Sequence, residues 1–451
     1  MWKLAVVVGL VAGGMTPVVA KGIDWEPCPE LRGMECATVR VPLDHLKPDG
    51  RTVGIAISRL PAEPGRRRGV LLTNPGGPGA PGIGYPRDLQ HLLGDVAKQY
   101  DVIGIDPRFM GASEPADCGP VRIADVFRSA RSRAEFDRAA RLAKGFVGRC
   151  RDDRLEYAGI RDVARDLDLV RQALGVAKIS YYGVSWGADL GVVYSQLFPG
   201  RVDRMVVDSV TDVEGSEYRH LATGERAEAA FDEWAAWAAW RDDEYRLGRT
   251  GTQVRKTVTR LIEQAARRPV GVGGYRLDGA AMPWVVQLGM GDESERELAA
   301  RNVRQLLDAA QGKPVTPSAE LAGWLRQYFE VDPAVSRFAA ASVAFTCNDN
   351  GWPRGPAQYW RDVQRTKERE PLFHTTFLPC AYWTQRTAEP ELQIGTDVPM
   401  LIVQAERDNI PLRWAQELHA KLPKSTLKTV DRRAHGVYEH LRTTVNEYLG
   451  S

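Results

Sequence analysis

The chain has 451 residues, of which 43% are hydrophobic and 26% are charged, a composition typical of a globular protein with a large core. Its formal net charge is only +2, so the charge balance does not indicate nucleic acid or a membrane surface as the main partner. We therefore expect no nucleic-acid binding and no stable membrane association.

The first twenty residues form a segment of their own. Lys3 is followed by an apolar run, and no further charge occurs before Lys21. The run ends at Ala20, a small residue suited to signal peptidase. Its strongly apolar part is too short and too rich in glycine for a good transmembrane helix. We expect residues 1–20 to be a cleaved signal peptide and the protein to be secreted.

Six cysteines agree with export, because disulfides persist in oxidising compartments. They allow fifteen pairings, and we expect sequence neighbours to pair, against the alternative of buried free thiols. No Cys-x-x-Cys pair occurs, so a structural zinc site has no support and no metal is expected. The expected pairs are Cys28–Cys36, Cys118–Cys150 and Cys347–Cys380.

Residues 21–213 read as strands alternating with helices. Residues 35–41 and 52–60 predict an antiparallel hairpin that opens a sheet. Strand, helix and strand at this spacing require right-handed crossovers, and so predict a parallel sheet. Buried-type strands are predicted at 70–73, 100–106, from 179 and at 204–208.

The strand–helix rhythm stops at about Val213 and returns at Val398. Between them, residues 214–395 read mostly as helices rich in tryptophan and arginine. We expect this segment to be a helical cap inserted into a sheet domain that is formed by residues 21–213 and 396–451.

One short strand runs directly into Gly183-Val184-Ser185-Trp186-Gly187, and a helical pattern follows at once. Strand, Gly-x-Ser-x-Gly and helix in this order are typical of a nucleophile elbow. A serine at a helix N-terminus meets backbone N–H groups that favour developing negative charge. The five-residue motif also arises by chance, so its interpretation depends on companion residues elsewhere in the chain.

An earlier strand runs into a loop that neither helix nor sheet can accommodate. Residues Asn74–Gly82 contain four glycines and three prolines, which lets the backbone approach a ligand with its N–H groups free. In serine hydrolases such a loop supplies the oxyanion hole. No Lys-Ser or Lys-Thr follows it, so a P-loop is excluded; a plain surface loop is the remaining alternative.

Two further polar residues follow the returning strands. Asp408 lies just past one of them and His435 just past the last. The carboxyl ends of parallel strands meet at one edge of a sheet, so we expect both side chains to lie near Ser185. A serine hydroxyl needs an imidazole to take its proton and a carboxylate to orient that imidazole.

Other residues compete for these roles. Glu406 is the alternative orienting carboxylate, and His419 and His440 are the alternative bases, although both are expected in helices. A metal site is not supported, because the spacing from His435 to His440 places them on different helix faces and matches no known zinc motif.

Together these motifs resemble secreted tripeptidyl aminopeptidases, which are α/β-hydrolases related to prolyl iminopeptidases. The resemblance implies an α/β-hydrolase fold with a mostly parallel eight-stranded sheet, an inserted helical cap and no cofactor. Carried over by position, the oxyanion donors are the backbone N–H groups of Gly77 and Trp186. The residues that carry it are Asn74–Gly79, Gly104–Pro115, Gly183–Gly187, Asp408 and His435.

The resemblance implies a serine exopeptidase that releases short peptides, expected to be tripeptides, from free N-termini through an acyl-enzyme. Such an enzyme must bind the α-ammonium group of its substrate, which calls for an acidic side chain from the cap. The candidates are Glu214, Glu217 and Asp349. Each has the alternative of being a solvated or structurally paired acid.

Two positions depart from the patterns of relatives. Pro75 stands where prolyl iminopeptidases have histidine, which fits the tripeptidyl branch. Phe109 stands where relatives have glycine, and we expect it to narrow the substrate pocket.

Two other functions compete with the peptidase. A secreted esterase or amidase for a small ester or amide would use the same triad. A catalytically inactive binding module would lack a triad member, whereas all three are present. The oligomeric state is left open.

Overall fold

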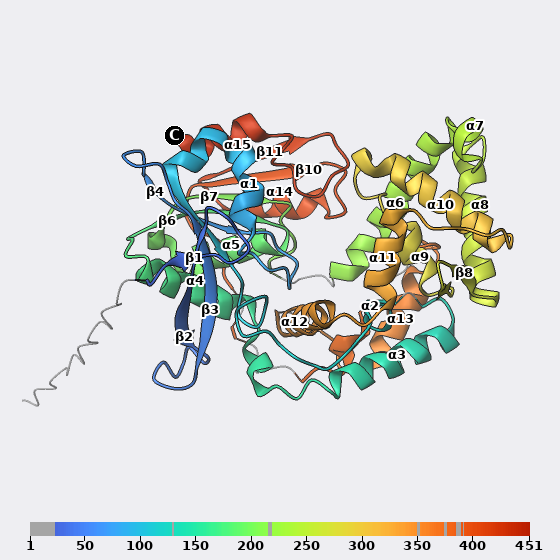
Figure 1. Cartoon of the computed structure of the whole chain (residues 1–451), viewed down its shortest axis with the longest axis horizontal. Helices are drawn as coiled ribbons and strands as arrows, with labels where there is room; N and C mark the ends of the chain where they lie inside the picture. The colour runs from blue at the N-terminus through green and yellow to red at the C-terminus, as the bar shows by residue number, and fades with distance from the viewer. Residues whose placement is uncertain are drawn as a thin grey trace, which may run out of the picture.

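The computed structural model describes residues 23–128, 130–214, 219–349, 352–373, 377–384, 389–390 and 392–451. The expected signal peptide and the candidate Glu217 lie outside these ranges. Figure 1 shows two lobes, a sheet with its covering helices on the left and a group of helices on the right.

The main sheet has nine strands in the order β1-β2-β3-β5-β4-β6-β7-β10-β11. Neighbours from β5 through β11 are parallel, whereas β1, β2 and β3 pair antiparallel. The ninth strand, beyond the eight expected, is β1, which has only two residues and leaves no sequence pattern. The strands are β1 Glu26–Pro27, β2 Glu35–Pro42, β3 Thr52–Leu60, β4 Gly69–Asn74, β5 Tyr100–Ile105, β6 Ile179–Val184, β7 Val202–Asp208, β10 Met400–Ala405 and β11 Ser425–Val430.

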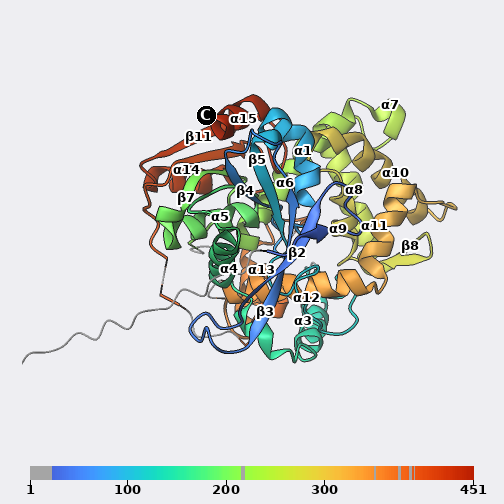
Figure 2. The same cartoon turned by 60° about the vertical axis from the view of Figure 1, so that its left-hand side comes forward.

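Helices cover both faces of the sheet, as Figure 2 shows from a second direction. Alternate strand residues point to opposite faces, so Tyr182 packs with one helix layer and Tyr181 with the other. Both faces are therefore buried, which explains the continuous apolar runs in the central strands. The first layer contains α1 (Tyr85–Leu93) and α15 (Arg442–Gly450), and the second contains α4 (Ile160–Ala173), α5 (Trp186–Leu197) and α14 (Leu412–Lys421).

A long insertion separates β7 from β10, although these strands are neighbours in the sheet. It contains two packing units. Helices α6 to α11 share a hydrophobic cluster of their own, whereas α12 and α13 pack into the main core. The elements are α6 Arg219–Ala239, α7 Asp242–Tyr245, α8 Gly251–Arg267, β8 Val270–Val272, β9 Tyr275–Leu277, α9 Met282–Val286, α10 Arg296–Ala310, α11 Ala319–Phe329, α12 Pro333–Asp349 and α13 Pro356–Thr366.

The three disulfides join the predicted partners. Cys28–Cys36 lies at the start of β2, Cys118–Cys150 closes the excursion that holds α2 (Ile123–Val126) and α3 (Arg133–Val147), and Cys347–Cys380 ties the end of α12 to a 3-10 turn. Within the described ranges, no helix combines the length and the hydrophobicity needed to cross a bilayer.

A buried ion pair lies behind the loop that follows β5. Arg108 has no exposed side-chain surface and donates to both carboxylate oxygens of Asp166 on α4, at 2.7 and 2.6 Å. Phe109 is fully buried beside it with φ +66, a conformation that favours glycine. The expectation that Phe109 narrows the substrate pocket is wrong, because its side chain belongs to this core instead.

Replacing Arg108 with alanine would leave Asp166 buried without its main counter-charge. We expect Arg108→Ala to lower the free energy of unfolding by about 3–5 kcal/mol, measured by urea denaturation. Arg51→Ala is the matched control, because Arg51 pairs with Asp153 at the surface, and we expect little change there. Equal losses in the two variants would contradict this account.

Candidate active site

The strand–turn–helix predicted around Ser185 is confirmed. Strand β6 ends at Val184, Ser185 adopts φ +57, and α5 begins at Trp186. A Cβ atom at Gly183 would lie 2.2 Å from the carbonyl oxygen of Gly187, so this position requires glycine. The Ser185 hydroxyl is thus presented on a tight, strained turn at the carboxyl end of the sheet.

The glycine- and proline-rich loop lies directly over this turn. Gly76 has φ +94, and a Cβ atom there would lie 2.3 Å from the Val184 carbonyl oxygen and 3.2 Å from the Trp186 nitrogen. Asn74 Oδ1 accepts a hydrogen bond from the Gly76 N–H at 2.9 Å, which helps to fix the loop. The candidate oxyanion residues Gly77 and Trp186 both line the pocket with Ser185. Because Trp186 is the first residue of α5, its N–H has no intrahelical acceptor.

Asp408 and His435 lie together as expected. His435 Nδ1 is 2.9 Å from Oδ1 of Asp408, whose side chain is completely buried. An ionised carboxylate only accepts hydrogen bonds, so this contact places a proton on Nδ1 and leaves Nε2 free of a proton in the neutral imidazole. Gln404 Nε2 donates to Asp408 Oδ2 at 2.9 Å, and the Ile410 N–H donates to Oδ1 at 3.0 Å. The carboxylate is therefore held in one orientation.

The segment after His435 is held by two residues that the sequence reasoning missed. Asp208 Oδ2 accepts the N–H groups of Val437 at 2.8 Å and Tyr438 at 3.1 Å, and Ser209 Oγ accepts that of Gly436 at 3.0 Å. Complete burial raises the pKa of Asp208 to about 6, against hydrogen bonds and the charge of His435 that lower it. The sequence does carry a signal for Asp208, an acidic residue at the end of a predicted parallel strand. The same kind of signal pointed to Asp408.

The end of β7 also contacts the serine turn. The Ser185 N–H donates to the backbone oxygen of Asp208 at 2.8 Å. A Cβ atom at Gly436 would lie 3.4 Å from Val184 Cγ1, so the residues next to His435 and Ser185 lie close together. The serine turn and the histidine segment are therefore anchored to one strand end.

Opposing effects act on the pKa of His435. Removal from water lowers it, but the hydrogen bond and the charge of Asp408 raise it, as do the charges of Asp208 and Asp189. The net pKa is raised above the ordinary value of 6.5. A serine nucleophile needs the neutral imidazole as its base, so the raised pKa moves the loss of activity in acid to a higher pH.

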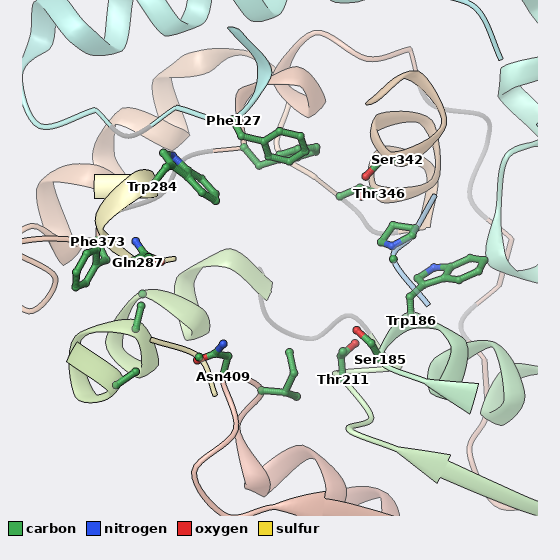
Figure 3. Close-up of a pocket in the computed structure, with 18 of the residues that line it drawn as sticks. Phe127, Ser185, Trp186, Thr211, Trp284, Gln287, Ser342, Thr346, Phe373 and Asn409 are labelled. Atoms are coloured by element: carbon green, nitrogen blue, oxygen red, sulfur yellow. The ribbon is translucent and has the colours of Figure 1, made fainter. Parts of the chain in front are cut away.

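A pocket of about 440 Å³ opens onto Ser185. Figure 3 shows Ser342 and Thr346 on the side of Trp186, with Trp284 and Phe373 across the pocket. Aromatic side chains dominate the walls, and none of the described lining residues is charged. The lining side chains beyond the glycines and alanines are Pro78, Phe127, Ser185, Trp186, Thr211, Trp284, Gln287, Met290, Ser342, Thr346, Trp352, Phe373, Phe377, Asn409 and Ile410.

Two of the three acidic candidates for ammonium binding, Asp349 and Glu214, do not line this pocket. Asp349 Oδ1 accepts the Ile160 N–H at 2.6 Å, and its Oδ2 accepts the indole N–H of Trp186 at 3.3 Å. The carboxylate thus caps α4 and supports the residue next to Ser185. Glu214 forms an ion pair with Lys421 on the outside of the sheet domain. Glu217 lies outside the described residues.

The alternative base and acid residues lie elsewhere. Glu406 accepts a hydrogen bond from the hydroxyl of Thr429, and His419 binds Ser425 on the surface. His440 is exposed and precedes the last helix instead of lying within it. In the part of the chain that the structure describes, no three His, Cys, Asp or Glu side chains are grouped so as to hold a metal ion.

The raised pKa of His435 predicts the pH dependence of the serine's reactivity. We expect the rate of Ser185 modification by an uncharged fluorophosphonate to fall in acid with a midpoint above 6.5, since protonation removes the base. In Asp408→Asn the midpoint should move to lower pH and the rate should fall by about 10⁴-fold. A wild-type midpoint below 6.5 would contradict the contact between Asp408 and His435.

The close approach of the glycine loop predicts a second effect. Gly76→Ala would push the loop away from Trp186, and we expect hydrolysis of an activated ester to fall by about 10²–10³-fold. The control is Gly84→Ala, where an added Cβ atom meets nothing within 4 Å. Similar activities in both variants would show that the loop contributes no oxyanion donor.

Comparison with known proteins agrees with this geometry. A model of the alpha/beta hydrolase fold matches residues 69–261, and a model of TAP-like proteins matches residues 366–451. The chain is 31% identical to a tripeptidyl aminopeptidase of Streptomyces lividans, over 94% of this chain and 83% of that protein.

Two relatives from Mycobacterium tuberculosis match about half of each chain. Serine protease Hip1 is 34% identical over 51% of this chain and 48% of that protein. Carboxylesterase B is 33% identical over 56% of this chain and 52% of that protein. With the Streptomyces relative matched over most of both lengths, the chain belongs to the tripeptidyl aminopeptidase family of α/β-hydrolases and is a serine peptidase.

Proposed function

We propose that the protein is a secreted exopeptidase that releases tripeptides from free N-termini through a Ser-His-Asp acyl-enzyme mechanism. The observation that carries the proposal is the hydrogen bond between Asp408 and His435 beside the serine turn, at one end of a pocket lined by aromatic side chains. The three disulfides support passage through an oxidising compartment.

In the proposed reaction, Ser185 Oγ attacks the carbonyl carbon of the scissile peptide bond while His435 Nε2 takes the hydroxyl proton. The N–H groups of Gly77 and Trp186 stabilise the oxyanion of the tetrahedral intermediate. His435 then gives its proton to the leaving amine, and the released polypeptide departs from a peptidyl ester on Ser185. A water molecule, deprotonated by His435, hydrolyses the ester and regenerates the serine.

Asp408 contributes by orienting the imidazole of His435 and by stabilising its protonated form. Its buried carboxylate holds the Nδ1 proton and stabilises the imidazolium that forms in each half of the reaction. Because Gln404 and the Ile410 N–H hold the same carboxylate, little reorganisation is needed when the imidazolium appears.

The pocket favours a short peptide segment with uncharged side chains. Its volume of about 440 Å³ is within the range of small-ligand sites. The described lining residues are uncharged and would leave a charged substrate side chain without a partner among them, which is costly. We therefore propose that the residues accommodated next to the scissile bond are apolar or aromatic.

For the α-ammonium group we retain Asp349, because its carboxylate lies against the indole of Trp186. Glu370 is an additional candidate, since its buried carboxylate packs against Gly224, which lines the pocket. Glu214 is not retained, because Lys421 already neutralises its charge away from the pocket.

We expect the rate of hydrolysis to depend on a free N-terminus in the substrate. We expect an unblocked tripeptide anilide to be hydrolysed about 10–100-fold better in kcat/KM than its N-acetylated form, since acetylation removes a charge-assisted contact. Ser185→Ala should reduce turnover on the order of 10⁶-fold. Full activity in Ser185→Ala would overturn the mechanism.

The same experiment tests the esterase alternative, which the similarity to carboxylesterase B favours. A preference for the acetylated peptide or for simple esters, with activity still lost in Ser185→Ala, would replace the exopeptidase with an esterase or amidase.

A further inference from the structure

Two arginines flank the catalytic pair in the sequence. Arg407 immediately precedes Asp408, and Arg433 stands two residues before His435. Both donate to one carboxylate, that of Glu233 on α6: Arg407 Nη1 lies 3.1 Å and Arg433 Nε lies 3.0 Å from Oε2. Arg433 Nη2 donates to Oε1 as well. The carboxylate of Glu233 therefore joins the loop of Asp408 to the loop of His435 from the helical insertion. Other ion pairs lie beside it: Arg407 Nε is 2.8 Å from Asp431 Oδ1, and Glu293 pairs with Arg407 and Arg432.

The connection is partly shielded from water. The side chain of Arg433 is 4% exposed and that of Glu233 is 32% exposed, so the pair is less weakened by solvent than an exposed one. Burial raises the pKa of Glu233, but hydrogen bonds and charges from Arg433 and Arg407 outweigh it and the net pKa is lowered. Glu233 therefore stays ionised at neutral pH.

Other contacts bring the insertion against the same loops. Arg226, also on α6, donates to the backbone oxygens of Asp408 at 3.0 Å and Glu406 at 2.9 Å. The Glu293 N–H donates to the backbone oxygen of Arg433 at 3.0 Å. Figure 3 shows Asn409, the neighbour of Asp408, beside α6 in light green.

We infer that Glu233 is a positioning residue for the catalytic pair, because it joins Arg407 of the Asp408 loop to the buried Arg433 of the His435 loop. The inference rests on the proposed Ser-His-Asp mechanism. Without the carboxylate, Arg433 would keep a buried charge with no counter-charge from α6. Arg407 would be held by Asp431 and Glu293 alone and would no longer be tied to Arg433. The hydrogen bond between Asp408 and His435 would then lengthen or lose alignment.

The chain offers a matched control on the same helix. Asp232, the neighbour of Glu233, accepts hydrogen bonds from Arg255 at 2.6 and 2.9 Å within the insertion. Both acids thus bind arginine, but only the arginines of Glu233 belong to the catalytic loops. Asp232→Asn removes a charge from α6 without touching those loops.

The test compares Glu233→Gln with Asp232→Asn in the full chain, using the unblocked tripeptide anilide and thermal unfolding. For Glu233→Gln we expect kcat to fall by up to about 10²-fold, as for a displacement near 1 Å, with KM within about twofold. The acid limb of kcat should also move to lower pH, because a displaced Asp408 raises the pKa of His435 less. The other charges that face His435, Asp208 from β7 and Asp189 from α5, are the same in both variants.

Unchanged kcat and an unchanged acid limb in folded Glu233→Gln would overturn the inference, as would equal changes in Asp232→Asn. If Glu233→Gln does not fold, Arg407→Gln takes its place, since it keeps the buried pair between Glu233 and Arg433. The acid limb should shift in the same direction, and an unchanged limb overturns the inference. Ser185→Ala tests the Ser-His-Asp mechanism separately from the role of Glu233. Activity that persists in Ser185→Ala overturns the mechanism, whatever the result for Glu233→Gln.

Discussion

The carboxyl end of β7 is the anchor on which the proposed catalytic geometry depends. The backbone oxygen of Asp208 receives the Ser185 N–H, and its carboxylate receives two successive N–H groups just past His435. The proposed nucleophile and base therefore share one support, although 250 residues separate Ser185 from His435 in the sequence. Because the carboxylate is charged and buried, its two hydrogen bonds are stronger than neutral ones. The relative position of the serine turn and the histidine segment therefore depends on the position of this strand end.

The insertion after β7 adds a second support from the opposite side. Glu233 and Arg226 of α6 contact the loops of Asp408 and His435. The insertion therefore supports these loops as well as lining the pocket. Sheet and insertion each hold part of the catalytic arrangement, and their packing together completes it. The loop after β10 follows a strand of the sheet but is also hydrogen-bonded to α6 of the insertion. It therefore has contacts with both parts of the molecule.

Much of the arrangement could be predicted from the sequence, because apolar strands and the residues after them are local signals. Ser185, Asp408 and His435 were found by their positions after strands, and the disulfides by their order in the chain. Asp208 carried the same signal but was indistinguishable from an ordinary strand end without knowing which loop would meet it. Glu233 had no local signal, since its partners lie far away in the sequence. The division of the insertion into two packing units likewise depends on which helix faces meet.

The packing of α12 has a consequence for substrate choice. Its residues Ser342 and Thr346 form one side of the pocket, and α12 is joined to the main core by packing and by Cys347–Cys380. Trp284 and Phe373, across the pocket, lie on the side of the second hydrophobic cluster. The width of the pocket is thus the gap between two separately packed bodies. The size of the substrate side chains that fit therefore depends on how these two bodies pack against each other. Substitutions at the boundary between the bodies, far from the bound peptide, can change which side chains are accepted.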